Sequence, residues 1–233
     1  MPGARLKQHL KAKHLNRMRW ITHQYSRRFG GGDTGPARNY FIDDRYVAQE
    51  EGRYFDAIEE DESWQVEVYQ LARRIFDDQA CRSVADIGCG SAAKLLQWFK
   101  AEKTWGVDVS PTYDWLVENY PDREWRKAGT AADFTADLVI MSDVIEHVND
   151  PIELLDYARS LDPRYLVIST PDRAQLWDKQ EALGPPSNRA HIREWTFKEF
   201  GAFMRDQFDV FDHHVSNFSQ ATQVVVARPK GAQ

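Results

Sequence analysis

The 233-residue sequence has only two cysteines and no long run of apolar residues. Cys81 and Cys89 are too few for a disulfide framework or for a metal site with four thiolates. No stretch approaches the roughly 18–20 consecutive apolar residues that a membrane-spanning helix needs. The first 20 residues carry charge without an apolar core, unlike a secretory signal. We therefore expect a protein of the reducing, cytoplasmic compartment.

The remaining composition is that of a globular chain, but its charge is unevenly distributed. Hydrophobic residues make up 42% and charged residues 28%, which excludes a mainly disordered chain. Residues 1–38 carry nine Lys and Arg against the single Asp33, a net charge of +8. Since the whole chain carries −6, the other 195 residues carry −14. The sequence therefore predicts a basic arm on an acidic body.

The basic arm has the pattern of an amphipathic helix that ends at a flexible joint. Four glycines and a proline lie within residues 30–36, a composition that interrupts regular structure. Before the joint, a stripe of residues recurs every three or four positions, namely Leu6, Leu10, His14, Met18, Ile21 and Tyr25. This spacing places them on one face of a helix, which could contact the body, a second subunit, nucleic acid or an anionic membrane surface. We predict two parts, the arm at residues 1–38 and a main domain at residues 39–233.

Strand-like runs alternate with helical candidates through most of the main domain. Strands are expected at residues 83–87, 105–107, 137–141 and 165–169, and helices at residues 62–78 and from about residues 91, 111 and 151. Such alternation predicts a parallel sheet covered by helices on both faces. Two further β-rich runs, residues 208–215 and 222–227, predict an antiparallel hairpin. The expected fold class is therefore α/β, a doubly wound and mostly parallel sheet with a C-terminal antiparallel hairpin.

The strongest motif lies at the end of the first expected strand. In Asp86-Ile87-Gly88-Cys89-Gly90, an acid is followed by two glycines and then by a helical candidate. Glycines at this point allow a ligand to approach the backbone closely. A dinucleotide would place its pyrophosphate on this loop, where the Asp86 carboxylate would repel it. The acid therefore favours a cationic or hydroxyl-bearing ligand and disfavours a dehydrogenase.

This motif resembles the first motif of class I S-adenosylmethionine (SAM)-dependent methyltransferases, whose fold is a seven-stranded sheet ending in a hairpin. Asp108 follows the second strand, Asp133 and Phe134 follow the third, and residues 137–148 are similar to the fourth motif of small-molecule, ubiquinone-pathway-like members. The resemblance implies SAM as cofactor, with its ribose at Asp108 and its adenine at Asp133 and Phe134. The residues implied in cofactor binding are Asp86, Gly88, Cys89, Gly90, Asp108, Val109, Asp133, Phe134 and Ser142.

A polar cluster is expected where the fourth strand ends. Asp143, Glu146 and His147 lie at the sheet edge at which doubly wound sheets bind ligands. One interpretation is structural, with Asp143 and Glu146 forming a capping box on a short helix. The other is a resemblance to the E-x-x-E-H ligands of a divalent cation such as Mg²⁺ in ubiquinone-pathway O-methyltransferases and in enzymes that methylate the terminal 2′-hydroxyl of small RNAs. It implies Asp143, Glu146, His147 and the downstream His191 as metal ligands, with Asp143 standing where those families have Glu.

His191 lies in a second segment that is expected to face the methyl acceptor. The segment resembles an H-x-R-x-[FWY]-[ST] pattern that lines the acceptor pocket of related methyltransferases. We predict His147, His191 and Asp143 as catalytic residues, with His191 acting as a base or orienting a hydroxyl. Arg193 is expected to hold an anionic acceptor or to pair with an acid of the body.

Two further patterns predict a helix cap and a lid. Thr196 and Glu199 have the spacing of a capping box at the start of a helix. Tyr40, Tyr46 and Tyr54 precede the first helix of the main domain, where methyltransferases often build a lid over the cofactor.

The expected function is transfer of the methyl group of SAM to a small-molecule acceptor, at oxygen rather than nitrogen. One alternative is an RNA ribose 2′-O-methyltransferase that uses a metal at the D-x-x-E-H cluster and the basic arm for RNA. The acidic body argues against the broad phosphate-binding surface that this alternative needs. The other alternative is a non-catalytic module that keeps the fold and binds a partner through its arm. Such a module has no need of the glycine loop and its acids.

Overall fold

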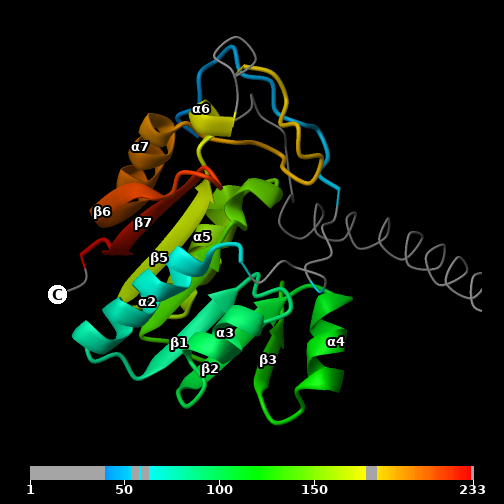
Figure 1. Ribbon diagram of the computed structural model, residues 1–233, viewed down its shortest axis with the longest axis vertical. Coiled ribbons are helices and arrows are strands. Elements are labelled where there is room, and N and C mark those ends of the chain that lie inside the picture. The colour runs from blue at the N-terminus through cyan, green and yellow to red at the C-terminus, as the bar shows by residue number, and fades with distance from the viewer. Residues whose placement is uncertain (1–39, 54–57, 59–62, 177–182, 232–233) are drawn as a thin grey trace, which may run out of the picture.

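A computed structural model describes residues 40–53, 58, 63–176 and 183–231. Its centre is a seven-stranded sheet in the order β3-β2-β1-β4-β5-β7-β6 (Figure 1). The strands are β1 (Ser83–Ile87), β2 (Lys103–Asp108), β3 (Glu124–Lys127), β4 (Leu138–Ser142), β5 (Tyr165–Pro171), β6 (Phe208–Asn217) and β7 (Thr222–Pro229). Strands β1 to β5 pair in parallel, whereas β7 pairs antiparallel with both β5 and β6. The predicted fold class is confirmed.

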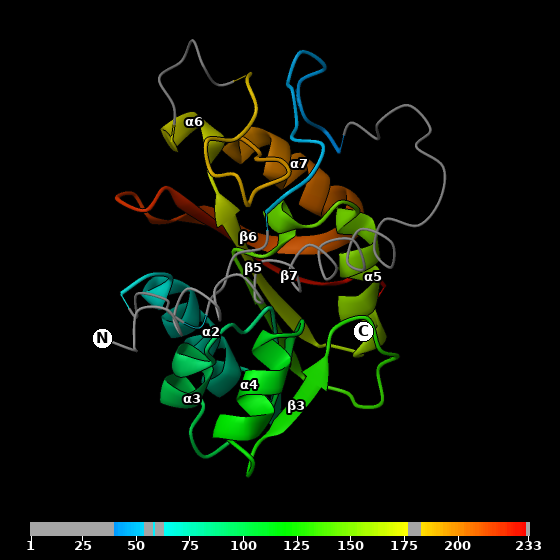
Figure 2. The same ribbon diagram turned by 90° about the vertical axis from the view of Figure 1, so that its right-hand side faces the viewer.

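Helices cover both faces of this sheet (Figures 1 and 2). One face is covered by α2 (Val66–Asp78), α3 (Ala93–Trp98) and α4 (Thr112–Asn119), and the other by α5 (Pro151–Ser160) and α7 (Phe197–Gln207). Strand β4 shows why both faces need cover, because its alternate side chains point in opposite directions. Leu138 and Ile140 join the core beneath α2, whereas Val139 and Met141 join the core beneath α5. A strand buried on both faces is apolar throughout, which made its position predictable.

Strand β3 is the element that the apolar pattern did not indicate. Its sequence is Glu-Trp-Arg-Lys, in which only Trp125 is buried. The strand lies at the edge of the sheet and pairs with β2 alone. An edge strand with one covered face needs few apolar residues, so it leaves little signal in the sequence. The capping box predicted for Thr196 and Glu199 is present at the start of α7.

Several predictions fall outside the described residues. These include the arm at residues 1–38 with its apolar stripe, and Tyr54 of the predicted lid. The other two tyrosines pack beside the loop after β5 and on α7. Tyr40 meets the ring of Phe203 edge-to-face at 5.8 Å, and the Tyr46 hydroxyl accepts a 3.0 Å hydrogen bond from the Glu194 amide. No described helix is long and apolar enough to cross a membrane.

Candidate functional site

The loop after β1 has the backbone shape that its glycines allow. Gly88 and Gly90 have φ values of 73° and 55°, in the left-handed region that favours glycine. Ala92 stands where the methyltransferases that this motif resembles usually have a third glycine, and it also has a positive φ of 57°. A Cβ added to Gly88 would lie 2.5 Å from Cγ2 of Val144, just after β4. The loop therefore passes close to the next strand end, and a side chain at residue 88 would push the two apart.

Asp86 is fully buried beneath this loop and faces α2. Its Oδ2 accepts a 2.8 Å hydrogen bond from the Tyr69 hydroxyl. Lys94, at the start of α3, is also buried, and its Nζ lies 6.0 Å from the centre of the Tyr69 ring. Tyr69 of α2 therefore contacts a residue of β1 through its hydroxyl and a residue of α3 through its ring. Neither Tyr69 nor Lys94 was a predicted site residue, because α2 meets the loop only in three dimensions.

Asp108 connects the end of β2 to the glycine loop. Its Oδ2 accepts from the Gly90 amide at 2.8 Å, and its Oδ1 accepts from the Val109 amide at 2.7 Å. The turn after β3 lies alongside, because the Ala128 amide donates to the Asp108 carbonyl at 2.8 Å. Cys89 is buried, and its Sγ would lie 2.9 Å from a Cβ added to Gly106. The structure therefore brings the predicted residues 86–90, 108 and 109 together at one strand edge.

Asp133 and Phe134 make their contacts elsewhere. Asp133 is exposed and accepts a 2.7 Å hydrogen bond from Nε of Arg126, which holds the pKa of this carboxyl below its usual value. Phe134 stacks on Trp105 with ring centres 4.7 Å apart. Neither contact reaches the glycine loop, so the predicted place of these residues at the adenine stays a prediction. The turn after β3, which includes Gly129 and Thr130, lies beside Asp108 and was not predicted as part of the site.

The end of β4 forms the second half of the site. Asp143 adopts a positive φ of 52° and is held by two neighbours. Ser169 Oγ donates to its Oδ1 at 2.7 Å, and Gln65 Nε2 donates to its Oδ2 at 3.0 Å. Burial raises the pKa of the Asp143 carboxyl, and these two hydrogen bonds oppose the shift. Ser142 lies next to it, with its Oγ 3.2 Å from that of Ser169.

Glu146 is a fully buried carboxyl with one oxygen unsatisfied. Its Oε2 accepts a 3.0 Å hydrogen bond from the Thr170 hydroxyl. Its Oε1 is buried and has no hydrogen-bond partner among the residues that the structure describes. Burial, followed by repulsion from Asp143, raises the pKa of Glu146 well above its usual value. The capping-box interpretation is wrong, since no side chain caps the short helix η2 (Ile145–His147).

His147 and His191 approach this unsatisfied oxygen. The Nδ1–H of His147 donates to the Ala190 carbonyl at 2.9 Å, and its Nε2 lies 3.9 Å from Glu146 Oε1. Burial, and then the neighbouring His191, lower the pKa of His147 to about 4, so this imidazole is neutral near pH 7. The two imidazole rings meet edge-to-face with centres 4.8 Å apart. In His191, Nδ1 lies 2.6 Å from Glu194 Oε1 and Nε2 lies 2.9 Å from Asn188 Nδ2.

Three of the four predicted metal ligands thus lie together. One ligand atom from each of Glu146, His147 and His191 lies within 4.8 Å of the other two. Asp143 is outside this group, because Ser169 and Gln65 hold its oxygens. One carboxylate oxygen and two imidazole nitrogens form a set that binds divalent transition metals and that also accepts hydrogen bonds from a hydroxyl.

Among the described residues Arg193 does not form the predicted pair with an acid, and its role at an anionic acceptor stays a prediction. Its guanidinium donates to the carbonyls of Val148 at 2.9 Å and Asn149 at 2.7 Å. It also lies over the Tyr40 ring at 4.8 Å. Burial lowers its pKa. Among the described residues Arg193 therefore holds the His191 loop against the segment that follows η2, and it pairs with carbonyl oxygens instead of an acid.

Residues 52–219 match the family model described as a methyltransferase domain. The chain belongs to this family. The methyltransferase also resembles solved structures, among them the methyltransferase domain of bacterial CtHen1, at 21% identity over 70% of this chain and 97% of that one, with a TM-score of 0.53. A SAM-dependent methyltransferase from Aquifex aeolicus is 16% identical over 75% and 98% of the two chains, with a TM-score of 0.53.

A third similar structure contains ligands. It is the 1,6-didemethyltoxoflavin-N1-methyltransferase of Burkholderia thailandensis with bound 1,6-didemethyltoxoflavin and S-adenosylhomocysteine (SAH), 16% identical over 71% of this chain and 79% of that one, with a TM-score of 0.51. No curated protein sequence matches this chain. The family match and the fold together make the protein a methyltransferase with the class I fold, and the similar structures include SAM-dependent enzymes. The ubiquinone-pathway-like subgroup stays a prediction.

Proposed function

We propose that this methyltransferase transfers the methyl group of SAM to a hydroxyl oxygen of a small-molecule acceptor bound beside Glu146, His147 and His191. The residues predicted for the cofactor and for the acceptor leave adjacent strands, and the side chain of Val144 joins the two regions by its contact with Gly88. Methyl transfer needs the acceptor atom in line with the sulfonium methyl, so adjacent sites at one edge suit the reaction.

The observation that carries this proposal is the unsatisfied Oε1 of Glu146. A buried carboxylate oxygen without a partner costs folding free energy, so it is retained where a ligand completes it. A hydroxyl donor or a cation would supply that partner. A hydroxyl must also lose its proton during methylation. The raised pKa of Glu146 suits this carboxyl to accept that proton, and the imidazole nitrogens are groups that bind a cation. These features favour oxygen over nitrogen as the methylated atom.

The same three residues fit a divalent cation. The hydrogen bond from His147 Nδ1–H to the Ala190 carbonyl leaves the lone pair on Nε2, the tautomer of a metal-ligating histidine. The lowered pKa of His147 keeps this ring neutral, as a ligand must be. A bound cation would lower the pKa of a coordinated hydroxyl. In this proposal Glu146, His147 and His191 hold the ion, and Asn188 moves off His191 Nε2 when that nitrogen binds.

The acceptor atom can be tested with [methyl-¹³C]SAM and small-molecule fractions of cell extract. We expect a product whose labelled carbon has the chemical shift of an O-methyl group. Once the acceptor is identified, turnover can be measured directly. Glu146→Gln should lower this turnover by at least about 100-fold. Glu153→Gln, which changes a partly exposed acid of α5, is the matched control and should not. A labelled N-methyl or C-methyl product would refute the proposal.

The cation has its own test in thermal unfolding with SAH bound. If a cation binds at this site, Mg²⁺ or Mn²⁺ at 100 times its Kd should stabilise the protein by about 2.7 kcal/mol, and EDTA should remove the effect. Glu146→Gln should abolish this stabilisation, whereas Glu153→Gln should retain it. Equal stabilisation of both variants would exclude the site.

The second candidate is methylation of a ribose 2′-hydroxyl in RNA. The cluster of one carboxylate and two imidazoles favours it, because adjacent ribose hydroxyls can both bind one cation. The basic arm, with its +8 charge, is the proposed contact for phosphates. Labelled methyl on short RNA oligonucleotides, with none on small molecules, would replace the first candidate by this one.

A further inference from the structure

The segment at residues 40–53 lies along the loop that carries His191. In Figure 1 the two run side by side at the top of the molecule, in blue and in yellow-orange. Their backbones are joined by hydrogen bonds from Val47 to Leu183 at 2.9 Å, from Gln49 to Ile192 at 2.8 Å and from Arg53 to Arg189 at 2.8 Å. Most of this segment precedes the family match, which begins at residue 52. Most of the segment therefore lies outside the residues that match the family model.

The His191 ring is held by one neighbour at each nitrogen. Glu194, a buried carboxylate that can only accept, receives Nδ1–H at 2.6 Å. The Asn188 side-chain oxygen accepts from the Ala190 amide, so its Nδ2, which can only donate, faces His191 Nε2 at 2.9 Å and Nε2 is the acceptor. The tautomer and the direction of the ring thus depend on where Glu194 and Asn188 lie.

The 40–53 segment contacts both of these neighbours. The Tyr46 hydroxyl accepts from the Glu194 amide at 3.0 Å. Gln49 Nε2 donates to the carbonyls of Pro186 and Asn188, each at 3.0 Å. Gln49 and Tyr46 therefore reach the His191 loop on either side of the histidine.

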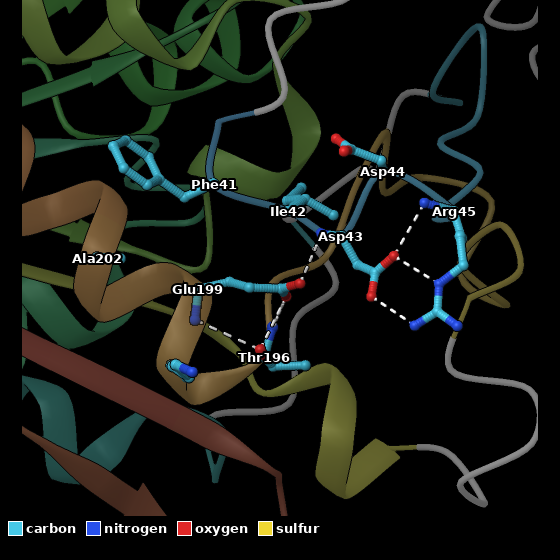
Figure 3. A pocket seen from close by; sticks show the side chains of 9 residues that line it. Phe41, Ile42, Asp43, Asp44, Arg45, Thr196, Glu199 and Ala202 are labelled. Atoms are coloured by element: carbon cyan, nitrogen blue, oxygen red, sulfur yellow. Dashed lines mark hydrogen bonds and ion pairs between the residues drawn. The ribbon is translucent and has the colours of Figure 1, made fainter.

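The segment is itself fixed to the start of α7. Figure 3 shows this region, where the Asp43 amide donates to Glu199 Oε1 at 2.8 Å. Both residues line an open hollow of about 680 Å³. Glu199 Oε2 also accepts a 2.8 Å hydrogen bond from Nη2 of Arg173. The Cζ atom of Arg173 lies 4.2 Å from the centre of the Tyr46 ring. Because α7 packs into the core, these contacts transmit its rigidity to the segment.

We propose that Tyr46 and Gln49 are positioning residues for His191, so that the segment preceding the family domain completes the acceptor side of the active site. The proposal rests on the proposed role of His191 at the acceptor. A loop is mobile unless other elements hold it, and a reacting group displaced by about 1 Å loses roughly 100-fold in rate. Tyr46 and Gln49 supply that support through the Glu194 amide and the Pro186 and Asn188 carbonyls.

The test uses Tyr46→Phe and Gln49→Ala, singly and together, in the full-length protein with EDTA and SAH present. Tyr46→Phe removes one oxygen and keeps the ring over Arg173, so the fold should be retained. Val47→Ala is the matched control, since it lies between the two and its side chain is 56% exposed. SAH affinity and the unfolding temperature should stay within the range of the control.

The first readout is the imidazole ¹⁵N–¹H spectrum of His191. In the parent and in Val47→Ala we expect a protected Nδ1–H signal, and in the double variant that signal should broaden or vanish through exchange with water. An unchanged signal would overturn the proposal whatever the reaction is. The second readout is turnover of the O-methylated acceptor, where kcat should fall about 10–100-fold with the KM for SAM within twofold. A lost signal with unchanged kcat would refute the role of His191 in the reaction and leave its positioning standing.

Discussion

Gly88→Ala is the substitution whose cost can be worked out most directly. Residue 88 has a φ of 73°, and a Cβ there would lie 2.5 Å from Cγ2 and 3.0 Å from Cγ1 of Val144. Ordinary carbon contacts are about 3.5–4.0 Å, so the loop or Val144 must move by about 1 Å. Val144 cannot move freely, because it is packed against the core beneath α5.

Two independent costs add to the effect of Gly88→Ala. A left-handed conformation costs a residue with a Cβ about 1–2 kcal/mol. Inserting a methyl group into packed surroundings costs about 1–3 kcal/mol more. We therefore expect the free energy of unfolding to fall by about 2–5 kcal/mol, a loss of roughly 4–20 °C in unfolding temperature for a chain of this size. Because the strain is released by shifting the loop, SAH should bind at least about tenfold more weakly.

The assay pairs thermal unfolding with calorimetric titration of SAH. Gly231→Ala is the control for the backbone cost alone, since its φ is 76° and no atom lies within 4 Å of the added Cβ. It should lose about 1–2 kcal/mol at most and keep the parent affinity for SAH. If Gly88→Ala binds SAH as tightly as Gly231→Ala does, the assignment of this loop to the cofactor is wrong.

Three other substitutions have defined outcomes. Thr196→Ala removes the cap of α7 and should cost about 1 kcal/mol of stability in denaturant unfolding, without changing SAH affinity. Gly106→Ala would place a Cβ 2.3 Å from the Trp125 ring, so it should destabilise the protein by at least about 1–3 kcal/mol and lower its unfolding temperature. Burial lowers the pKa of His213, so the unfolded state binds a proton first and stability should fall as the pH drops through about 6.5. His213→Phe keeps a ring against Phe197 and should flatten that pH profile, and an unchanged slope would contradict the reasoning.

The residues predicted for the cofactor could be recognised because their signals are local. Asp86, Gly88, Gly90 and Asp108 each follow or end a buried strand, and a strand buried on both faces has an apolar run that is visible in the sequence. The carboxyl ends of parallel strands meet at one edge, so residues distant in the chain were expected together. The Gly90 to Asp108 hydrogen bond is the direct consequence.

The partners of these residues left no such signal. Tyr69 on Asp86, Gln65 on Asp143 and Thr170 on Glu146 are contacts between elements, and nothing in the spacing of either element indicates the other. Asp143 shares a motif with Glu146, but its carboxylate faces Gln65 and Ser169, and the spacing of the motif did not indicate this either. Sequence spacing places side chains on the same strand end, whereas the neighbouring elements decide which way each one points.

The sequence by itself indicated the family, through the resemblance of its motifs at residues 86–90 and 137–148. It also determined the doubly wound sheet with its antiparallel hairpin, because hydrophobic periodicity and turn residues act over short stretches of chain. Only the tertiary structure decided which polar atoms remain unsatisfied and which are held. Glu146 Oε1 is left without a partner, Asp143 is held by Gln65 and Ser169, and His191 lies between Glu194 and Asn188. The physical reason is that a buried polar group is defined by everything packed around it, and those neighbours come from segments far apart in the chain.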